Sequence, residues 1–251
     1  LVFPVHIYGL PTDMDPILDV ANKYEIPVIE DAAEALGVEY KGRKCGNIGF
    51  ASVFSFYANK IITGGEGGAI TTNDDDLAHG LRKNRSLAHD TERFVHSQLG
   101  WNHRISGLSA SLIASQLSQV EFFKSRKLEI ASLYNKGLAG HPWISLAPEN
   151  VSYASNLYWV FPILLNQNSP YSASSLKDIL YESGIETRRF FCPMHLQPIV
   201  KRILGAIENQ GENFPVATNL WENGLYLPSG NGNTNEEIEK VIEKMWALVS
   251  D

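Results

Sequence analysis

The sequence is poor in cysteine, in long apolar runs and in clustered positive charge, and each shortage excludes a class of protein. Two cysteines, Cys45 and Cys192, indicate neither a disulfide framework nor a metal site, so we expect unpaired thiols in a reducing compartment, the cytoplasm. No apolar run approaches the roughly 20 residues of a membrane span, so we expect no membrane partner. The net charge is -7 and basic runs are short, which argues against nucleic acid as a partner.

The remaining composition is that of an ordinary globular protein. Of 251 residues, 44% are hydrophobic and 20% are charged, which is enough apolar material for one large domain or two small ones.

The first half of the chain alternates between strand and helix patterns. The opening LVFPVHIYG is typical of a strand and the loop after it, and Pro27–Asp31 is a short apolar strand that ends in an acid. Between them Thr12 or Asp15 can cap a helix over residues 17–24. Strand, helix and strand at this spacing predict a parallel sheet. A buried opening strand needs sheet neighbours, so we expect an N-terminal part to be missing from this chain.

The middle of the chain predicts the boundary between two domains. A polar segment, Asn84–Arg104, is long for a simple connector, and such loops are usually functional or disordered. The longest helical pattern follows over residues 108–138, where we expect one helix that bridges the domains. We therefore predict domains at 1–128 and 129–251, the second a smaller α/β domain. Other predicted elements are a hairpin at 38–46, strands at 51–56, 68–72, 158–165 and 185–191, and helices starting at Asp74, Ser174 and Thr234, the last with a Thr234–Glu237 capping box.

The stretch FSFYANKIITGGEGGAI, Phe54–Ile70, carries the strongest chemical signal. It places Lys60 just after an alternating apolar strand and just before four glycines. A lysine there can be a Schiff-base residue once burial lowers its pKa, and Asp31 ends another strand. Lysine for the aldehyde and aspartate for the pyridinium nitrogen are the minimum equipment for pyridoxal phosphate. Alone, however, a lysine after a strand is most often a solvated surface residue, and GGEGG is equally compatible with a turn that needs φ > 0.

Taken together, these segments resemble the sugar aminotransferases of the DegT/DnrJ/EryC1/StrS family. These are fold-type I pyridoxal-phosphate enzymes that aminate keto groups on nucleotide-linked sugars. The resemblance runs from PVHIYG to LYLPSG, essentially the whole chain. It implies an α/β fold with an incomplete, mostly parallel large domain, because members have a further N-terminal part ahead of the position of Leu1.

The resemblance assigns cofactor-binding roles to five residues. In EDAAEALG, Asp31 matches the aspartate that keeps the pyridinium nitrogen protonated, and Glu34 lies near the cofactor's phenolic oxygen. In SFYANK, Ser55 matches the phosphate-binding hydroxyl and Lys60 the Schiff-base lysine, which also moves the proton between carbons. A dehydratase branch of the family has histidine at the position of Lys60, so that branch is disfavoured. In RFVHSQLGWNHR, Asn102 matches an asparagine that reaches across a homodimer to the partner's cofactor phosphate; alone it would more often be a turn residue.

A second-domain stretch, GIETRRFFCPMHLQP, resembles the family segment near the sugar nucleotide. Arg188, Phe191 and His195 are the substrate-side candidates, although a lone His195 would more often be structural. Arg189 stands where proline is usual in the family, which puts the local backbone rigidity in doubt.

The predicted function is transfer of an amino group, with glutamate as the expected donor, to a nucleotide-linked keto-deoxysugar in a perosamine-synthase-like reaction. The alternative is a truncated, non-catalytic remnant, or a fragment whose fold and site another polypeptide completes. The family's N-terminal phosphate-binding turn and ring-stacking aromatic residue have no counterpart here, so cofactor binding by this chain alone is expected to be weak.

Overall fold

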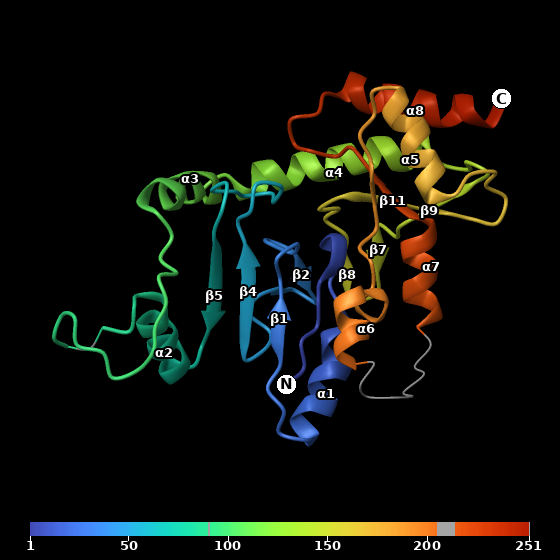
Figure 1. Ribbon diagram of the computed structural model, residues 1–251. Helices are drawn as coiled ribbons and strands as arrows, with labels where there is room; N and C mark the ends of the chain where they lie inside the picture. Colours follow the sequence, from blue (N-terminus) through green and yellow to red (C-terminus); the bar gives the residue numbers. More distant parts are fainter. Residues whose placement is uncertain (90, 205–213, 251) are drawn as a thin grey trace. The chain divides into compact units, whose positions relative to one another are not determined.

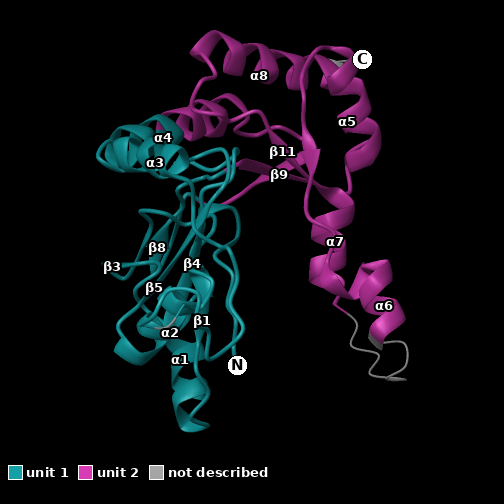
Figure 2. Cartoon of the chain, turned by 60° about the vertical axis from the view of Figure 1, so that its left-hand side comes forward, with its two compact units in different colours: residues 1–128, 149–159 teal, residues 129–148, 160–251 magenta. Residues whose placement is uncertain are grey.

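The computed structural model describes residues 1–89, 91–204 and 214–250 (Figure 1). The chain divides into two compact units, coloured teal and magenta in Figure 2. Unit 1 consists of Leu1–Leu128 and Glu149–Trp159, and unit 2 of Glu129–Pro148 and Val160–Asp251. The segment 149–159 thus groups with the first unit, although it lies beyond residue 128 in the sequence.

The main sheet of unit 1 has the order β1-β4-β5. Strand β1 (Ile29–Asp31) is parallel to β4 (Ala51–Ser55), which is antiparallel to β5 (Gly68–Thr72). The opening segment runs parallel to β1, but it forms isolated bridges from Val2 and Val5 in place of the continuous strand that the sequence predicts. Pro4 lies between these bridges, and proline has no N–H to donate to a strand ladder.

Helix α1 (Met14–Lys23) begins after Asp13, so the prediction that Thr12 or Asp15 caps it is wrong. Both side chains have other partners. The hydroxyl of Thr12 donates to the carbonyl of Val5 at 2.7 Å, and Asp15 forms ion pairs with Lys41 and Arg43. The predicted acidic start of α2 (Asp75–Arg85) is confirmed, because the Asp74 carboxylate accepts the Leu77 N–H at 2.7 Å.

A second small sheet of unit 1 has the order β3-β2-β8-β7. The predicted hairpin is confirmed as β2 (Glu39–Tyr40) and β3 (Arg43–Lys44). The returning segment supplies β7 (Asn150–Val151) and β8 (Ala154–Ser155), and β8 pairs antiparallel with β2. This pairing joins 149–159 to unit 1.

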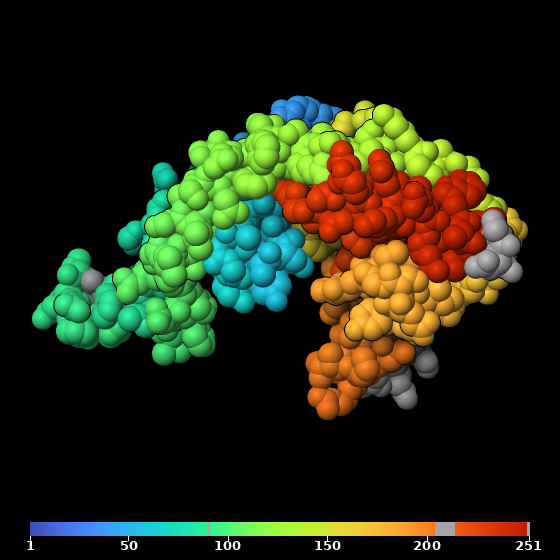
Figure 3. Space-filling model, turned by 90° about the horizontal axis from the view of Figure 1, so that it is seen from above, coloured from blue at the N-terminus to red at the C-terminus, as the bar shows by residue number. Residues whose placement is uncertain are grey.

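The predicted single helix over 108–138 is wrong, because the chain forms α3 (Gly107–Leu117) and then α4 (Val120–Gly137). The hydroxyls of Ser115 and Ser118 bond back to the carbonyls three residues before them. Such bonds compete with the helical backbone ladder, and these two lie at the break. Helix α3, green in Figure 3, lies at the surface, where Leu108 and Leu112 are 77% and 48% exposed.

The sheet of unit 2 has the order β10-β11-β9-β6, with every neighbouring pair antiparallel. Its strands are β6 (Ile144–Leu146), β9 (Phe161–Leu165), β10 (Arg188–Arg189) and β11 (Gly224–Leu227). The predicted strand over 185–191 is therefore shortened to two residues. The N–H of Ile185 still bonds to the carbonyl of Leu180, which closes the preceding helix and delays the strand.

The helices of unit 2 have well-defined starts. Ser172 and Ser175 form a capping box before α5 (Ala173–Glu182). The predicted Thr234–Glu237 box before α8 (Asn235–Ser250) is confirmed by hydrogen bonds in both directions, of 2.9 and 3.2 Å. The remaining helical elements are η1 (Ile7–Gly9) of unit 1 and η2 (Met194–Leu196), α6 (Pro198–Leu204) and α7 (Pro215–Asn223) of unit 2.

Candidate functional site around Lys60

Lys60 lies in the turn after β4, where its N–H donates to the carbonyl of Tyr57 at 3.0 Å. Its side chain is only 13% exposed, unlike a solvated surface lysine. The ammonium nitrogen is 3.7 Å from Glu34 Oε1 and 4.1 Å from the centroid of the Trp159 ring. Burial lowers the pKa of Lys60, and the carboxylates of Glu34 and Asp31 oppose this shift. A lysine that gives up its proton more readily is a better nucleophile.

Two carboxylates act on this lysine from the end of β1 and the turn after it. Asp31 is the last residue of β1, and its Oδ1 accepts the N–H of Ala33 at 3.0 Å, which turns the chain toward Glu34. Burial raises the pKa of Glu34, against the opposing effects of the Tyr8 N–H, which donates to Oε2 at 2.7 Å, and of Lys60. Because Asp31 interacts electrostatically with both Glu34 and Lys60, the three ionisable groups form one cluster.

Two aromatic residues complete this cluster, and sequence reasoning missed both. The ring of Trp159 stacks on that of Tyr8 with 6.4 Å between centroids, and its indole N–H donates to the carbonyl of Asn59 at 3.2 Å. Gly9 permits the close approach of the backbone next to Tyr8 to that of Trp159, since a Cβ at Gly9 would lie 2.7 Å from the backbone nitrogen of Trp159. Lys127 donates to the carbonyl of Trp159 at 2.7 Å, and burial lowers its pKa to about 8. We call Tyr8, Asp31, Glu34, Lys60 and Trp159 the Lys60 cluster.

Ser55 and the glycine loop flank the Lys60 turn. Ser55 ends β4 and is half-buried, and its hydroxyl accepts the N–H of Tyr57 at 3.3 Å. In the loop, Gly65 and Gly67 have φ of 80° and 138°, which side-chain-bearing residues rarely adopt. These angles support the interpretation of GGEGG as a turn that requires glycine.

Asn102 lies in the segment between α2 and α3, where it forms an isolated bridge with Ser86 and is exposed to solvent. Within the part of the chain that the structure describes, no hydrogen bond, ion pair or ring contact joins it to the Lys60 cluster. Its neighbours Leu99 and Trp101 are 90% and 61% exposed.

The substrate-side candidates all belong to unit 2. Arg188 lies in β10 and is paired with Glu186 at 3.2 Å, and Phe191 is half-exposed. His195 lies in η2, where its Nε2 is 3.0 Å from the hydroxyl of Thr218. His195 therefore has a structural partner within its own unit.

Arg189, which stands where the family pattern has proline, is anchored through its side chain. Its guanidinium donates to the carbonyl of Trp221 at 2.9 Å and lies 4.8 Å from the centroid of that ring. These contacts tie β10 to α7 by a route that proline does not offer.

Comparison with known proteins identifies the family of this chain. The model of the DegT/DnrJ/EryC1/StrS aminotransferase family matches residues 1–246. The chain belongs to this family. It is 35% identical over 242 residues to the GDP-perosamine synthase of Caulobacter vibrioides (strain ATCC 19089 / CIP 103742 / CB 15), covering 96% of this chain and 64% of that one.

Two further relatives agree with this assignment. EpsN of Bacillus subtilis (strain 168) is named as a pyridoxal phosphate-dependent aminotransferase. It is 33% identical to this chain, and the alignment covers 98% of this chain and 63% of EpsN. The structure of S. venezuelae DesV, solved in complex with a ketimine intermediate, has a TM-score of 0.85 and 30% identity, covering 98% of this chain and 64% of DesV. The expected fold type I is thereby confirmed. The chain spans just under two thirds of the length of these relatives.

The residues of the Lys60 cluster, together with Ser55, fit the cofactor on which members of this family depend. A largely buried amine with a lowered pKa suits the aldehyde of pyridoxal phosphate, a strand-end carboxylate suits its ring nitrogen, and the hydroxyl of Ser55 suits its phosphate. Among the residues described, no cluster of His, Cys, Asp and Glu could hold a metal ion, and no helix has the length and apolar character needed to cross a membrane.

Proposed function

We propose that this protein is a pyridoxal-phosphate-dependent aminotransferase that aminates a keto-deoxysugar carried on a nucleotide, with glutamate as amino donor. One observation carries the proposal: the Lys60 amine is largely buried, has a lowered pKa, and lies between Glu34 and the face of Trp159. The similarity to a GDP-perosamine synthase favours a 4-keto-6-deoxy sugar as substrate.

The three ionisable residues of the cluster, together with Ser55, then have defined tasks. When bound, pyridoxal phosphate withdraws electrons from the carbon that carries the amino group. Asp31 would hold the ring nitrogen protonated, Glu34 would lie at the phenolic oxygen, and Ser55 would bind the phosphate. Lys60 Nζ would hold the cofactor at rest and, once released, would take the proton from one carbon and return it to the next.

The remaining roles are proposed for residues outside the cluster. Asn102 would reach the cofactor phosphate of a partner subunit in a homodimer, and support comes from the exposed apolar side chains of Leu99 and Trp101 beside it. Arg188, Phe191 and His195 would contact the sugar nucleotide. A cytoplasmic location is proposed because Cys45 and Cys192 are both free thiols.

A second candidate is a non-catalytic fragment that another polypeptide completes. The observation in its favour is a row of alternate apolar side chains along the opening segment: Leu1, Phe3 and Val5 are between 42% and 74% exposed. Side chains two residues apart share one face of an extended segment, and an exposed apolar face there suits contact with a further chain segment.

Trapping with borohydride separates the two candidates. The purified chain is mixed with pyridoxal phosphate, reduced, digested and mapped by mass spectrometry. The aminotransferase proposal expects a cofactor adduct on Lys60 that is lost in Lys60→Ala. Lys127 is the internal control, because it too is buried with a lowered pKa, and modification of both lysines to the same extent would indicate unspecific chemistry. Absence of any adduct at saturating cofactor would favour the fragment.

A further inference from the structure

Trp159, which covers the Lys60 amine, is held by hydrogen bonds to separate parts of unit 1. Its backbone N–H donates to the carbonyl of Tyr8 at 3.0 Å, and its indole N–H donates to the carbonyl of Asn59 at 3.2 Å. Its own carbonyl accepts a hydrogen bond from the ammonium group of Lys127 at 2.7 Å. Tyr8 and Asn59 belong to segments of the site, whereas Lys127 comes from α4 and has no task in the proposed function.

Lys127 is an unusual residue for a buried helix position. It is only 6% exposed, although lysine is seldom buried, and burial lowers its pKa to about 8. By contrast, Lys124, one turn earlier on α4, pairs with the exposed Glu121 at 3.0 Å. Because removing an ammonium group from water costs free energy, a position that needed only to pack would favour an apolar side chain. The amine of Lys127 therefore indicates a task for its hydrogen bond.

That hydrogen bond lies beside a strained turn. Tyr158 has a φ of 54°, in the left-handed region that bulky residues rarely adopt. Such a conformation persists only where the surrounding contacts fix it. The N–H of Tyr158 donates to Oδ1 of Asn156 at 2.8 Å, and the next residue, Trp159, is fixed at its carbonyl by Lys127. Lys127 is thus one of the contacts that fix the turn from which the indole projects.

We propose that Lys127 is a positioning residue, which holds the Trp159 carbonyl and thereby keeps the indole over the amine of Lys60. The ring centroid lies 4.1 Å from that amine, so the ring excludes water from one side of it. Burial is the largest effect on the pKa of Lys60 and lowers it, against the carboxylates of Glu34 and Asp31. When the indole is displaced, water reaches the amine, and its pKa rises toward the ordinary value.

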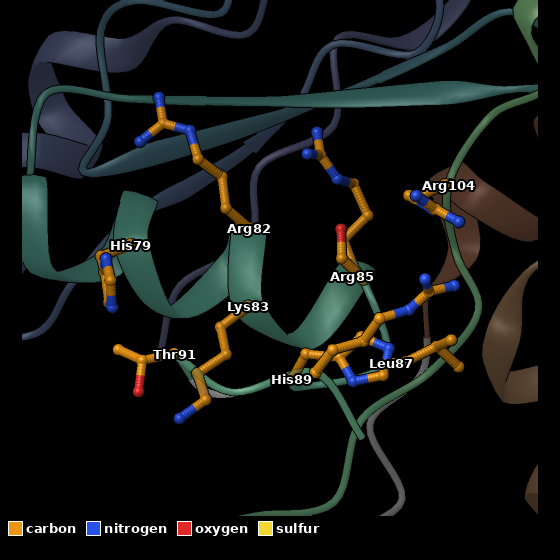
Figure 4. Close-up of a pocket in the computed structure, with 10 residues that line it drawn as sticks. His79, Arg82, Lys83, Arg85, Leu87, His89, Thr91 and Arg104 are labelled. Carbon is orange, nitrogen blue, oxygen red and sulfur yellow. The ribbon is translucent and has the colours of Figure 1, made fainter. Parts of the chain in front are cut away.

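The test measures the reactivity of Lys60 against pH in the cofactor-free chain. Brief labelling with acetic anhydride, digestion and mass spectrometry give a pH midpoint for each lysine. We expect Lys127→Met, which keeps the length of the side chain but removes its donor, to raise the midpoint of Lys60 by roughly half a pH unit or more. The matched control is Lys124→Met on the same helix, which should leave the midpoint unchanged. Lys83 is the internal reference, because it lines a pocket beside the end of α2 (Figure 4) whose described lining includes no residue of the Lys60 cluster.

A double-mutant cycle tests whether Lys127 acts through the indole. In a Trp159→Leu background, Lys127→Met should cause no further shift, because the ring that it positions is already gone. Additive shifts, or an equal shift in Lys124→Met, would overturn the proposal. A downward shift would also overturn it, since the ring face would then mainly stabilise the ammonium form of Lys60.

Two further variants guard against a trivial effect on folding. If Lys127→Met does not fold, Lys127→Gln, whose shorter side chain carries a neutral amide, should shift the midpoint of Lys60 in the same direction. Lys127→Arg, which keeps a cationic donor, should retain the midpoint of the native chain. A lower urea midpoint with no change at Lys60 would mean that Lys127 only stabilises the fold, and would overturn the proposal.

The importance of Lys127 for amino transfer rests on the proposed function, but its effect on Lys60 does not. These measurements use no cofactor, so the two failures are distinguishable. A shifted Lys60 midpoint in a chain that gives no borohydride-trapped adduct would support the positioning role and count against the aminotransferase. A trapped adduct with an unshifted midpoint in folded Lys127→Met would do the reverse.

Discussion

Replacing Glu30 with glutamine should destabilise the sheet that presents Asp31. Glu30 alternates with Asp31 along β1, and its fully buried carboxylate is hydrogen-bonded to the opening segment, to one loop and to the neighbouring strand β4. Glutamine has the same shape but exchanges one acceptor oxygen for an NH₂ donor, which would face N–H groups. The partners of Glu30 are His6 Nε2 at 3.1 Å, the N–H groups of Gly46, Ile48 and Gly49 at 2.7 to 2.8 Å, and the Ser52 hydroxyl at 2.8 Å.

The size of the effect follows from the pKa of Glu30. Burial raises this pKa, but hydrogen bonds from His6 and the loop N–H groups outweigh burial and lower it from 4.5 to about 2. The difference between the folded and unfolded chains corresponds to about 3 kcal/mol of folding free energy. Because the folded pKa is the lower one, this stability is present above pH 4.5 and is lost as the pH falls toward 2.

Urea unfolding of both proteins, followed by circular dichroism, measures the difference. We expect Glu30→Gln to lower the free energy of unfolding by about 3 kcal/mol at pH 7, and the gap to narrow steadily below pH 4.5. Glu39→Gln is the control, since this half-exposed carboxylate pairs with the half-exposed Lys44 at the surface. Its unfolding midpoint should hardly change. A gap for Glu30→Gln that is absent at pH 7, or that stays constant with pH, would refute the reasoning.

Three further outcomes test the Lys60 site. Asp31→Asn should retain the trapped cofactor on Lys60 yet nearly abolish turnover in an amination assay, because the ring nitrogen would no longer be held protonated. Asn102→Ala should weaken cofactor binding, measured by titration, only if ultracentrifugation shows a dimer. Trp159→Leu should shift cofactor attachment to higher pH, since less burial raises the pKa of Lys60 toward its ordinary value, whereas Trp101→Leu, at an exposed position, should not.

Each outcome has a clear opposite. Near-normal turnover of Asp31→Asn would contradict the proposal that Asp31 holds the ring nitrogen of the cofactor protonated. Equal weakening by Asn102→Ala in a proven monomer would contradict the contact across subunits. An unchanged pH dependence in a folded Trp159→Leu protein would mean that the ring does not keep water from the amine.

The sequence predicted the features that depend on neighbouring residues. A hairpin turn, a capping box and a strand-end lysine are encoded within a few positions, and the structure contains the hairpin at 39–44 and the Thr234–Glu237 box. The helix break at Ser118 and Gln119 escaped prediction, because apolar periodicity continues across it while serine hydroxyls compete for the backbone.

The aromatic part of the site could not be predicted because its residues are distant in sequence. Tyr8 acts through its backbone N–H, which carries no residue-specific signal, and Trp159 follows Lys60 by almost a hundred positions. Only the fold brings them together. The roles of Asp31, Ser55 and Asn102 remain predictions of the family resemblance.

The return of residues 149–159 to unit 1 has a consequence for synthesis and engineering. The chain passes between the units three times, after Leu128, Pro148 and Trp159, so no single cut separates them. A fragment ending at Leu128 would contain Lys60 but lack the strand that pairs with β2 and the indole beside the amine. On the ribosome, too, the indole of Trp159 can cover the Lys60 amine only after residue 159 has been made, when its N–H closes a loop of 100 residues onto the Asn59 carbonyl.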